Sequence, residues 1–281
     1  GGWRGGGGPS YENDFSFYIS EDVSLKKVKF IIKDPNGNTI IDLMKSDEYL
    51  FDVDMDSNTL KSGVHTAYWD LEYEAPEMQK DFVSMYYSAS RGYGPEAVPG
   101  NYMIELSINE EVLSVPLTVS VDPRWDVSKA DLQNQFDIAN QVIKLINESQ
   151  KKLNEMRQII TQIKSYITLT KEKEFNNDIK QLGNKVIDKI VAIESELYQN
   201  KIKTSQDEIN YARKWTNHIT HLYDRVTTDI QRPNDGMIKR LDELTKNYNT
   251  IISPYKAILE NDLNSFTSFL KEKGITGIII D

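Results

Sequence analysis

An apolar seam across residues 132–167 constrains the fold of this 281-residue chain more than any other feature. Its members recur in alternating steps of four and three, a period of about 3.5 residues over about five heptads. Gln150 and Arg157 interrupt the seam. A helix of ~40 residues is ~60 Å long and cannot bury such a seam alone, so the sequence predicts partner helices. The apolar members are Leu132, Phe136, Ala139, Ile143, Ile146, Leu153, Ile160, Ile163 and Ile167.

Three further amphipathic stretches follow the seam and supply these partners. A capping box at residues 205–208 predicts the start of the third helix, Pro254 should interrupt the fourth, and Gly274 should end it. Short links between four helices favour an up-down four-helix bundle over residues 124–281. The seam could instead pair with another chain in a dimeric coil. The expected helices cover residues 128–167, 177–198, 205–226 and 237–274, the first being the longest.

Residues 10–123 carry the pattern of short antiparallel strands. Alternating β-branched and aromatic residues are separated by turn signals, such as Asp-Pro-Asn-Gly at residues 34–37. Six or seven strands at this spacing predict an Ig-like, fibronectin-like antiparallel β-sandwich. The predicted fold class is therefore α+β and multidomain: a Gly-rich tether at residues 1–9, the β-sandwich at 10–123 and the four-helix bundle at 124–281. Trp69, Tyr102 and Trp125 should be core or joint residues.

A long loop at residues 75–99 breaks the strand pattern and is rich in aromatic side chains. Tyr86, Tyr87 and Tyr93 are its candidate recognition residues, because aromatic residues on loops often form binding surfaces. The same residues could equally pin the loop onto its own sheet or onto the helices. Pro99 and Gly100 should shape the turn that leads into the last hairpin.

Charge and composition exclude several classes of function. Residues 1–123 hold 9 Lys and Arg against 21 Asp and Glu, whereas residues 124–281 hold 24 against 22. No basic face with interleaved aromatic residues appears, so we expect no nucleic-acid partner. The longest apolar runs are too short for a transmembrane segment. Without cysteine the chain has no disulfide, and its Gly-Gly-Trp start leads us to expect a processed chain or a fragment.

The candidate chemical motifs are weak, so we predict no catalytic, metal or cofactor site. Aspartates alternate in FDVDMDSN at residues 51–58, but the Gly and Glu of a calcium-binding EF-hand loop are missing at their places. His218 and His221 have a spacing that zinc can use, yet no third ligand is apparent. Glu72 with Glu74, like the neighbouring pair at 110–111, cannot face each other across a cleft as glycoside hydrolysis requires.

Several stretches together resemble the C-terminal region of large bacterial proteins with sortilin-like β-propellers, often labelled BNR-repeat or glycosyl-hydrolase-like. They are the Gly-rich lead, Trp-Asp-Leu at 69–71, Val-Pro-Gly-Asn-Tyr at 98–102, Asp-Pro-Arg at 122–124 and the Gln-Asp helix start at 206–207. The resemblance covers nearly the whole chain and implies an upstream propeller in the same polypeptide. The propeller box Ser-x-Asp-x-Gly-x-x-x-x-Trp does not occur in these residues. Any glycosidase activity would reside in the missing propeller, so no catalytic residue is implied here.

The expected function is a non-catalytic C-terminal interaction or scaffolding module of a secreted, periplasmic or cell-surface bacterial β-propeller protein. Its partner would be an envelope protein or a glycan. The alternative is a carbohydrate-binding accessory module of a glycoside hydrolase, in which Tyr86, Tyr87 and Tyr93 stack on sugar rings.

Overall fold

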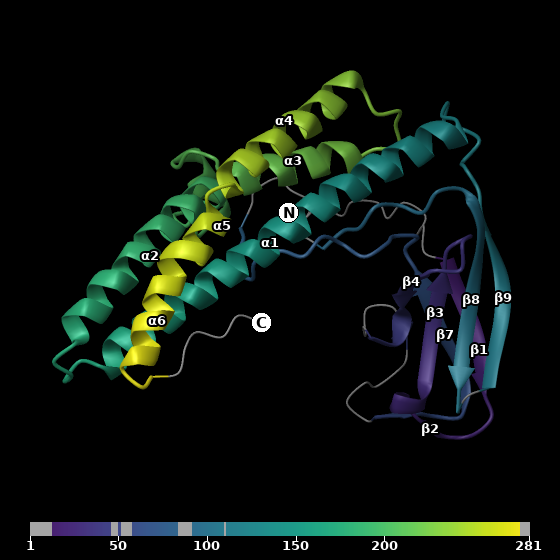
Figure 1. Ribbon diagram of the computed structural model, residues 1–281. Coiled ribbons are helices and arrows are strands. Elements are labelled where there is room, and N and C mark those ends of the chain that lie inside the picture. Colours follow the sequence, from purple (N-terminus) through teal and green to yellow (C-terminus); the bar gives the residue numbers. More distant parts are fainter. Residues whose placement is uncertain (1–12, 46–49, 52–57, 84–91, 110, 276–281) are drawn as a thin grey trace, which may run out of the picture. The chain divides into compact units, whose positions relative to one another are not determined.

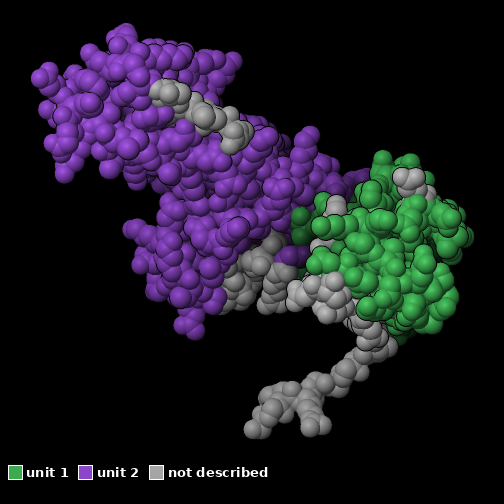
Figure 2. All heavy atoms as spheres, turned by 90° about the horizontal axis from the view of Figure 1, so that it is seen from below, with its two compact units in different colours: residues 1–75, 93–136, 230–232 green, residues 76–92, 137–229, 233–281 purple. Residues whose placement is uncertain are grey.

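The computed structural model describes residues 13–45, 50–51, 58–83, 92–109 and 111–275. The fold is α+β, with small antiparallel sheets followed by a helical region (Figure 1). The chain forms two compact units, which Figure 2 distinguishes by colour. The strand unit comprises residues 1–75, 93–136 and 230–232, and the helical unit comprises residues 76–92, 137–229 and 233–281.

The boundaries of these units differ from a simple division at residue 123. Residues 76–92, from the long loop, belong to the helical unit, and the first turns of the long helix belong to the strand unit. The chain therefore leaves the strand unit after Ala75 and returns to it at Tyr93.

All described strands pair antiparallel and form three small sheets. The strand orders are β1-β7-β5, β2-β6 and β4-β3-β8-β9. The strands are β1 (Asn13–Ile19), β2 (Val23–Ser24), β3 (Val28–Lys33), β4 (Thr39–Asp42), β5 (Leu50–Phe51), β6 (Thr59–Leu60), β7 (Gly63–Trp69), β8 (Gly100–Ile108) and β9 (Glu111–Val119).

The predicted turn at residues 34–37 is confirmed and joins β3 to β4. The Asp34 carboxylate accepts hydrogen bonds from the backbone N–H groups of Asn36 at 2.9 Å and Asn38 at 2.8 Å. Gly37 has a φ of 84°, the left-handed conformation that this turn requires. β4 is short, because the chain enters a 3₁₀ turn, Leu43–Lys45, directly after Asp42.

One apolar core joins the strands of the two larger sheets. Phe15 and Phe17 from β1 meet Phe30 from β3 edge-on, with ring centroids 6.4 and 5.4 Å apart. Trp69 and Tyr102 are buried as predicted, and their rings lie 5.5 Å apart. Trp125 lies in the turn after Asp122, at the predicted joint, but it is half-exposed and belongs to neither described core.

The first helix is confirmed as the longest element, and its neighbours complete the helical region. Turns of 3₁₀ helix at Leu25–Lys27 and Ser205–Ile209 lie outside the longer helices. The helices are α1 (Lys129–Leu169), α2 (Asn176–Leu197), α3 (Trp215–Thr227), α4 (Asp235–Ile252) and a last segment of α5 (Tyr255–Ala257), a π-helical turn (Ile258–Leu263) and α6 (Asn264–Glu272).

The seam of α1 is buried within the chain itself. Ile146, Leu153 and Ile163 have no exposed surface and share one core with apolar residues of α2, α3, α4 and the last segment. The apolar faces of these helices thus bury one another. This burial supports use of the seam inside the chain over pairing with another chain.

The prediction of the third helix was wrong at its start. Asp207 does cap a turn, since its carboxylate accepts from the backbone N–H groups of Lys203 and Thr204 at 2.8 Å each, but the turn is a short 3₁₀ helix. Ile209, which lies within the helix predicted for residues 205–226, ends this 3₁₀ turn and is 78% exposed. A capped turn does not propagate without an apolar face to bury. The α-helix begins at Trp215, which is buried.

The predicted interruption at Pro254 and the predicted stop at Gly274 are both confirmed. α4 ends at Ile252, and helical structure resumes at Tyr255, because Pro254 has no N–H to continue the ladder. α6 ends at Glu272, and the backbone N–H of Ile275 closes the end by donating to the Leu270 carbonyl at 2.9 Å.

Candidate functional site

The candidate recognition tyrosines fall on the long loop between β7 and β8. Tyr86 and Tyr87 lie outside the described residues. Tyr93 stands at the start of the second described part of the loop and is half-exposed. The choice between recognition and packing for Tyr86 and Tyr87 therefore stays a prediction. The described parts of the loop, however, show how its two ends are held.

The first limb of the loop, residues 76–83, packs onto the helical unit through apolar side chains. Pro76 is buried, and Met78 and Phe82 contact the helical core. The Phe82 ring lies 6.3 Å from the ring of Tyr198, the residue that follows α2. Apolar burial of this kind fixes the limb on the helices.

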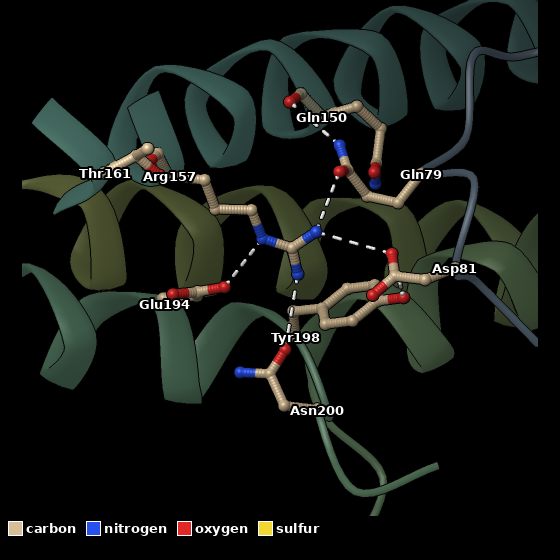
Figure 3. Close-up of polar contacts among 8 residues, drawn as sticks. All are labelled: Gln79, Asp81, Gln150, Arg157, Thr161, Glu194, Tyr198 and Asn200. Atoms are coloured by element: carbon tan, nitrogen blue, oxygen red, sulfur yellow. Dashed lines mark hydrogen bonds and ion pairs between the residues drawn. The ribbon is translucent and has the colours of Figure 1, made fainter. Parts of the chain in front are cut away.

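A polar cluster around Arg157 fixes the same limb with directional bonds (Figure 3). The Arg157 guanidinium donates to Glu194 Oε1 at 2.8 Å, to Gln79 Oε1 at 2.9 Å and to Asn200 Oδ1 at 3.2 Å. Its Nη1 also lies 3.4 Å from Asp81 Oδ1. The guanidinium of arginine presents five N–H donors in a rigid planar fork, whereas lysine presents three on a flexible stem. We call these residues, together with Tyr198, the Arg157 cluster.

The electrostatics of the Arg157 cluster favour its ionised form. Burial lowers the pKa of Arg157, but the hydrogen bond and charge of Glu194, together with the charge of Asp81, outweigh burial and hold the pKa above its ordinary value. The guanidinium also lies 4.8 Å from the centre of the Tyr198 ring. Tyr198 donates its hydroxyl to Asp81 at 3.1 Å, and burial followed by the Asp81 charge raises the pKa of Tyr198. The Arg157 cluster therefore holds the limb through a charged guanidinium that is paired with the carboxylates of Asp81 and Glu194.

Two further bonds tie the limb to α1. The backbone N–H of Glu77 donates to Asn147 Oδ1 at 2.8 Å, and the Gln79 side-chain amide donates to the Gln150 carbonyl at 3.3 Å. Gln150 and Arg157 are the residues that interrupt the apolar seam. At Gln150 the acceptor is the backbone carbonyl, and its own side-chain amide donates to Ser149 Oγ at 3.4 Å. Sequence reasoning missed the Arg157 cluster, yet the signal was present at Arg157, because a charged residue in a buried seam needs polar partners.

A shallow groove lies beside this limb on the helical unit. Its volume is about 340 Å³. Polar and charged residues of both signs line it, whereas typical small-molecule sites are lined mainly by hydrophobic and aromatic side chains. Among the residues described, no group of three or more His, Asp and Glu side chains could hold a metal ion. The lining residues are Glu77, Asn147, Glu148, Lys151, Asn154, Glu155 and Gln158.

The second limb of the loop, residues 92–99, is fixed within the strand unit. The Glu72 carboxylate accepts from the backbone N–H of Gly94 at 2.8 Å, and the N–H of Tyr73 donates to the Pro95 carbonyl at 3.0 Å. A Cβ on Gly94 would lie 1.7 Å from the Tyr73 carbonyl oxygen, so the close approach requires glycine. Glu72 thus has a structural role at the base of the loop.

The remaining sequence candidates are two histidines, the FDVDMDSN stretch and the pair at 110–111. His218 and His221 lie on α3, and burial, followed by neighbouring arginines, lowers the pKa of each. Most of the FDVDMDSN stretch, residues 52–57, lies outside the described residues, as does one member of the pair at 110–111.

Comparisons with known proteins identify no relative of this chain: no family model, no curated protein and no solved structure matches it. The resemblance to propeller-associated proteins therefore stays a prediction. None of the described helices is both long and apolar enough to cross a membrane.

Proposed function

We propose that this chain is a non-catalytic interaction module, the C-terminal part of a secreted, periplasmic or cell-surface bacterial β-propeller protein, with an envelope protein as its partner. The placement beside a propeller rests on the sequence resemblance alone. The interaction role rests on one observation, the way in which the long loop is held.

That observation is the anchoring of both described limbs of the loop. The first limb is fixed by the Arg157 cluster, and the second by the Glu72 and Tyr73 bonds to Gly94 and Pro95. Tyr86 and Tyr87 lie on the segment between these anchors. The first anchor lies in the helical unit and the second in the strand unit, so each end of the loop is held by its own unit. A loop with held ends loses less conformational entropy on binding than a loop with free ends, which supports a presenting role for the loop.

The finer architecture belongs to the same proposal. We infer an Ig-like sandwich, in which β1-β7-β5 corresponds to strands B-E-D and β4-β3-β8-β9 to strands C′-C-F-G. The Tyr102 hydroxyl donates to the Val98 carbonyl at 2.6 Å near the start of β8, as in the tyrosine corner of Ig-like domains. The helices would form an up-down four-helix bundle with a long first helix.

The test is affinity capture from a solubilised bacterial envelope with the full chain as bait. A Tyr86→Ser/Tyr87→Ser variant should lose a protein that the wild type retains. Tyr18→Ser is the matched control, because Tyr18 is exposed on β1 opposite Val64, near the start of β7, whereas the loop follows the end of β7; this variant should retain the partner. A captured protein that is insensitive to the loop variant, or no specific capture, would show that the interaction proposal is wrong.

A glycan array with the same three proteins and a Tyr93→Ser variant decides the alternative. The half-exposed ring of Tyr93 is the described feature that suits stacking on a sugar. Glycan binding that needs Tyr86, Tyr87 and Tyr93, with no captured protein, would favour the carbohydrate-binding module instead.

A further inference from the structure

The edge strand β9 exposes apolar side chains on the face that should be buried. β8 and β9 pair in register, with Leu106 opposite Leu113 and Ile104 opposite Val115. Residues directly opposite each other in an antiparallel pair point to the same face of the sheet. Leu106 and Ile104 are buried in the core, yet Leu113 is 70% exposed and Val115 is 57% exposed.

This uncovered surface is confined to the first half of β9. Val112, on the opposite face, is 55% exposed, whereas Val119, at the far end of the strand, is buried. Isolated exposed apolar residues are normal on protein surfaces, but a contiguous group on an edge strand marks an association site. None of the described strands pairs with β9 on its outer side, and a further strand there would both continue the sheet and bury these side chains.

The backbone of β9 limits which strand can pair there. Ile108 and Glu111 flank a two-residue turn, so they face each other as a hydrogen-bonded pair, and such pairs alternate along the hairpin. The N–H groups of Val112 and Ser114 accordingly point away from β8, toward the open edge. The next outward position is Pro116, which has no N–H. The row of outward backbone N–H groups therefore ends at Ser114. The exposed side chains of Val112, Leu113 and Val115 likewise lie before Pro116.

We propose that β9 of a second copy of this chain covers this edge, antiparallel, with the two-fold axis at Leu113. In that register Val112 of each copy lies opposite Ser114 of the other, and the two positions exchange four backbone hydrogen bonds without using Pro116. The two Leu113 side chains meet at the axis, on the core face of one continuous sheet. This surface is distinct from the long loop, so the proposal stands independently of the proposed function.

The net charge of the strand unit should make the strength of this dimer depend on salt concentration. β9 itself carries only one charged residue, Glu111, so the paired strands hold little like charge. Residues 1–123, however, carry a net charge of about −12, and two copies repel each other at long range. Salt screens such repulsion over about 10 Å at 0.1 M. Self-association should therefore strengthen with salt, and the two-fold interface closes on itself rather than growing into fibres.

The decisive experiment uses cysteine placement in the full chain, which contains no native cysteine. Leu113→Cys puts two thiols across the axis in a non-hydrogen-bonded pair, where Cα atoms are about 4.5 Å apart and a disulfide can form. Val115→Cys is the matched control, because its two copies would be about 13 Å apart, four residues along the strand. Mild oxidation should give covalent dimer with the first variant and little with the second.

Sedimentation equilibrium over micromolar to millimolar concentrations tests the same interface without cysteine. Wild type should self-associate, more strongly at 0.5 M than at 0.05 M salt, and Leu113→Lys should weaken association roughly tenfold or more by placing like charges opposite each other. Val64→Lys, at a similarly exposed position on β7, should leave it unchanged. A wild-type chain that stays monomeric throughout, or faster cross-linking at residue 115 than at 113, would overturn the proposal.

Discussion

Ile163 of α1 and Gly183 of α2 approach so closely that a Cβ on Gly183 would lie 2.6 Å from Ile163 Cγ2. A glycine inside a helix costs about 1 kcal/mol relative to alanine. Glycine is nevertheless required at position 183, because the two helices pack too closely there to leave room for a side chain. Phe266 and Ile167 enclose the same spot, with atoms at 3.2 and 3.3 Å from that Cβ position.

Gly183→Ala should therefore destabilise the helical unit by about 1–2 kcal/mol, since overpacking outweighs the gain in helix propensity. Urea unfolding followed by the helical circular dichroism signal measures the change. Combining it with Ile163→Ala removes the clashing methyl group, so the two changes should be less damaging together than the sum of their separate effects. Strict additivity of the two would contradict the close contact.

Arg157→Met should release the first limb of the loop and cost about 2–3 kcal/mol, because Glu194 stays largely buried without its partner. Hydrogen exchange of residues 77–82 should rise while exchange in α3 stays unchanged. Arg157→Lys keeps the charge but not the fork, and it should also raise exchange in the limb.

Arg240→Met is the matched control for this change. Arg240 pairs with Glu243 at 3.1 Å on an exposed surface of α4, and such pairs contribute about 0–1 kcal/mol. If Arg157→Met left the exchange of the limb at the level of this control, the Arg157 cluster would not be its anchor.

Tyr102→Phe should destabilise the strand unit by about 1–1.5 kcal/mol. The change removes the hydroxyl that donates to the Val98 carbonyl at 2.6 Å and leaves a buried acceptor without that donor. Thermal unfolding of the strand unit checks this. Tyr18→Phe, on the exposed face of β1, should change stability by less than about 0.5 kcal/mol. Equal effects from the two substitutions would remove the support that Tyr102 gives to an Ig-like strand unit.

Lowering the pH should reduce the free energy of unfolding of the helical unit through protonation of His218 and His221. Burial, followed by the charges of Arg240 and Arg213, lowers the pKa of His218, and burial, followed by Arg225 and Arg213, lowers the pKa of His221. The unfolded chain then binds more protons than the folded one as pH falls. The stabilisation is complete above the unfolded pKa of about 6.5 and is lost as pH falls through the lowered folded values.

The measurement is the free energy of unfolding of the helical unit at pH 7.5 and pH 5.5. A His218→Gln/His221→Gln variant should lose less stability between these values than the wild type. Arg240→Gln, which removes a charge that acts on both imidazoles, should also reduce the loss. An unchanged loss in the double variant would show that other groups titrate in this range.

The sequence by itself determined the order and type of the main elements. The heptad seam from Leu132 to Ile167 predicted α1, and the turn at 34–37 predicted the pairing of β3 with β4, because periodicity and turn chemistry are local properties. The same local reasoning failed at Ile209. A capping carboxylate starts a turn, but whether a helix continues depends on an apolar surface to pack against, which lies elsewhere in the chain.

Only the tertiary structure decided where the charged interruption of the seam finds its partners. Arg157 is visible in the sequence as a break, but Gln79, Asp81 and Glu194, whose side chains it contacts, lie far from it along the chain. Likewise, nothing local reveals that Gly183 faces Ile163, or that the core face of β9 stays uncovered at Leu113. Each of these features depends on which distant residues the fold brings together, and a pattern along one segment carries no record of that.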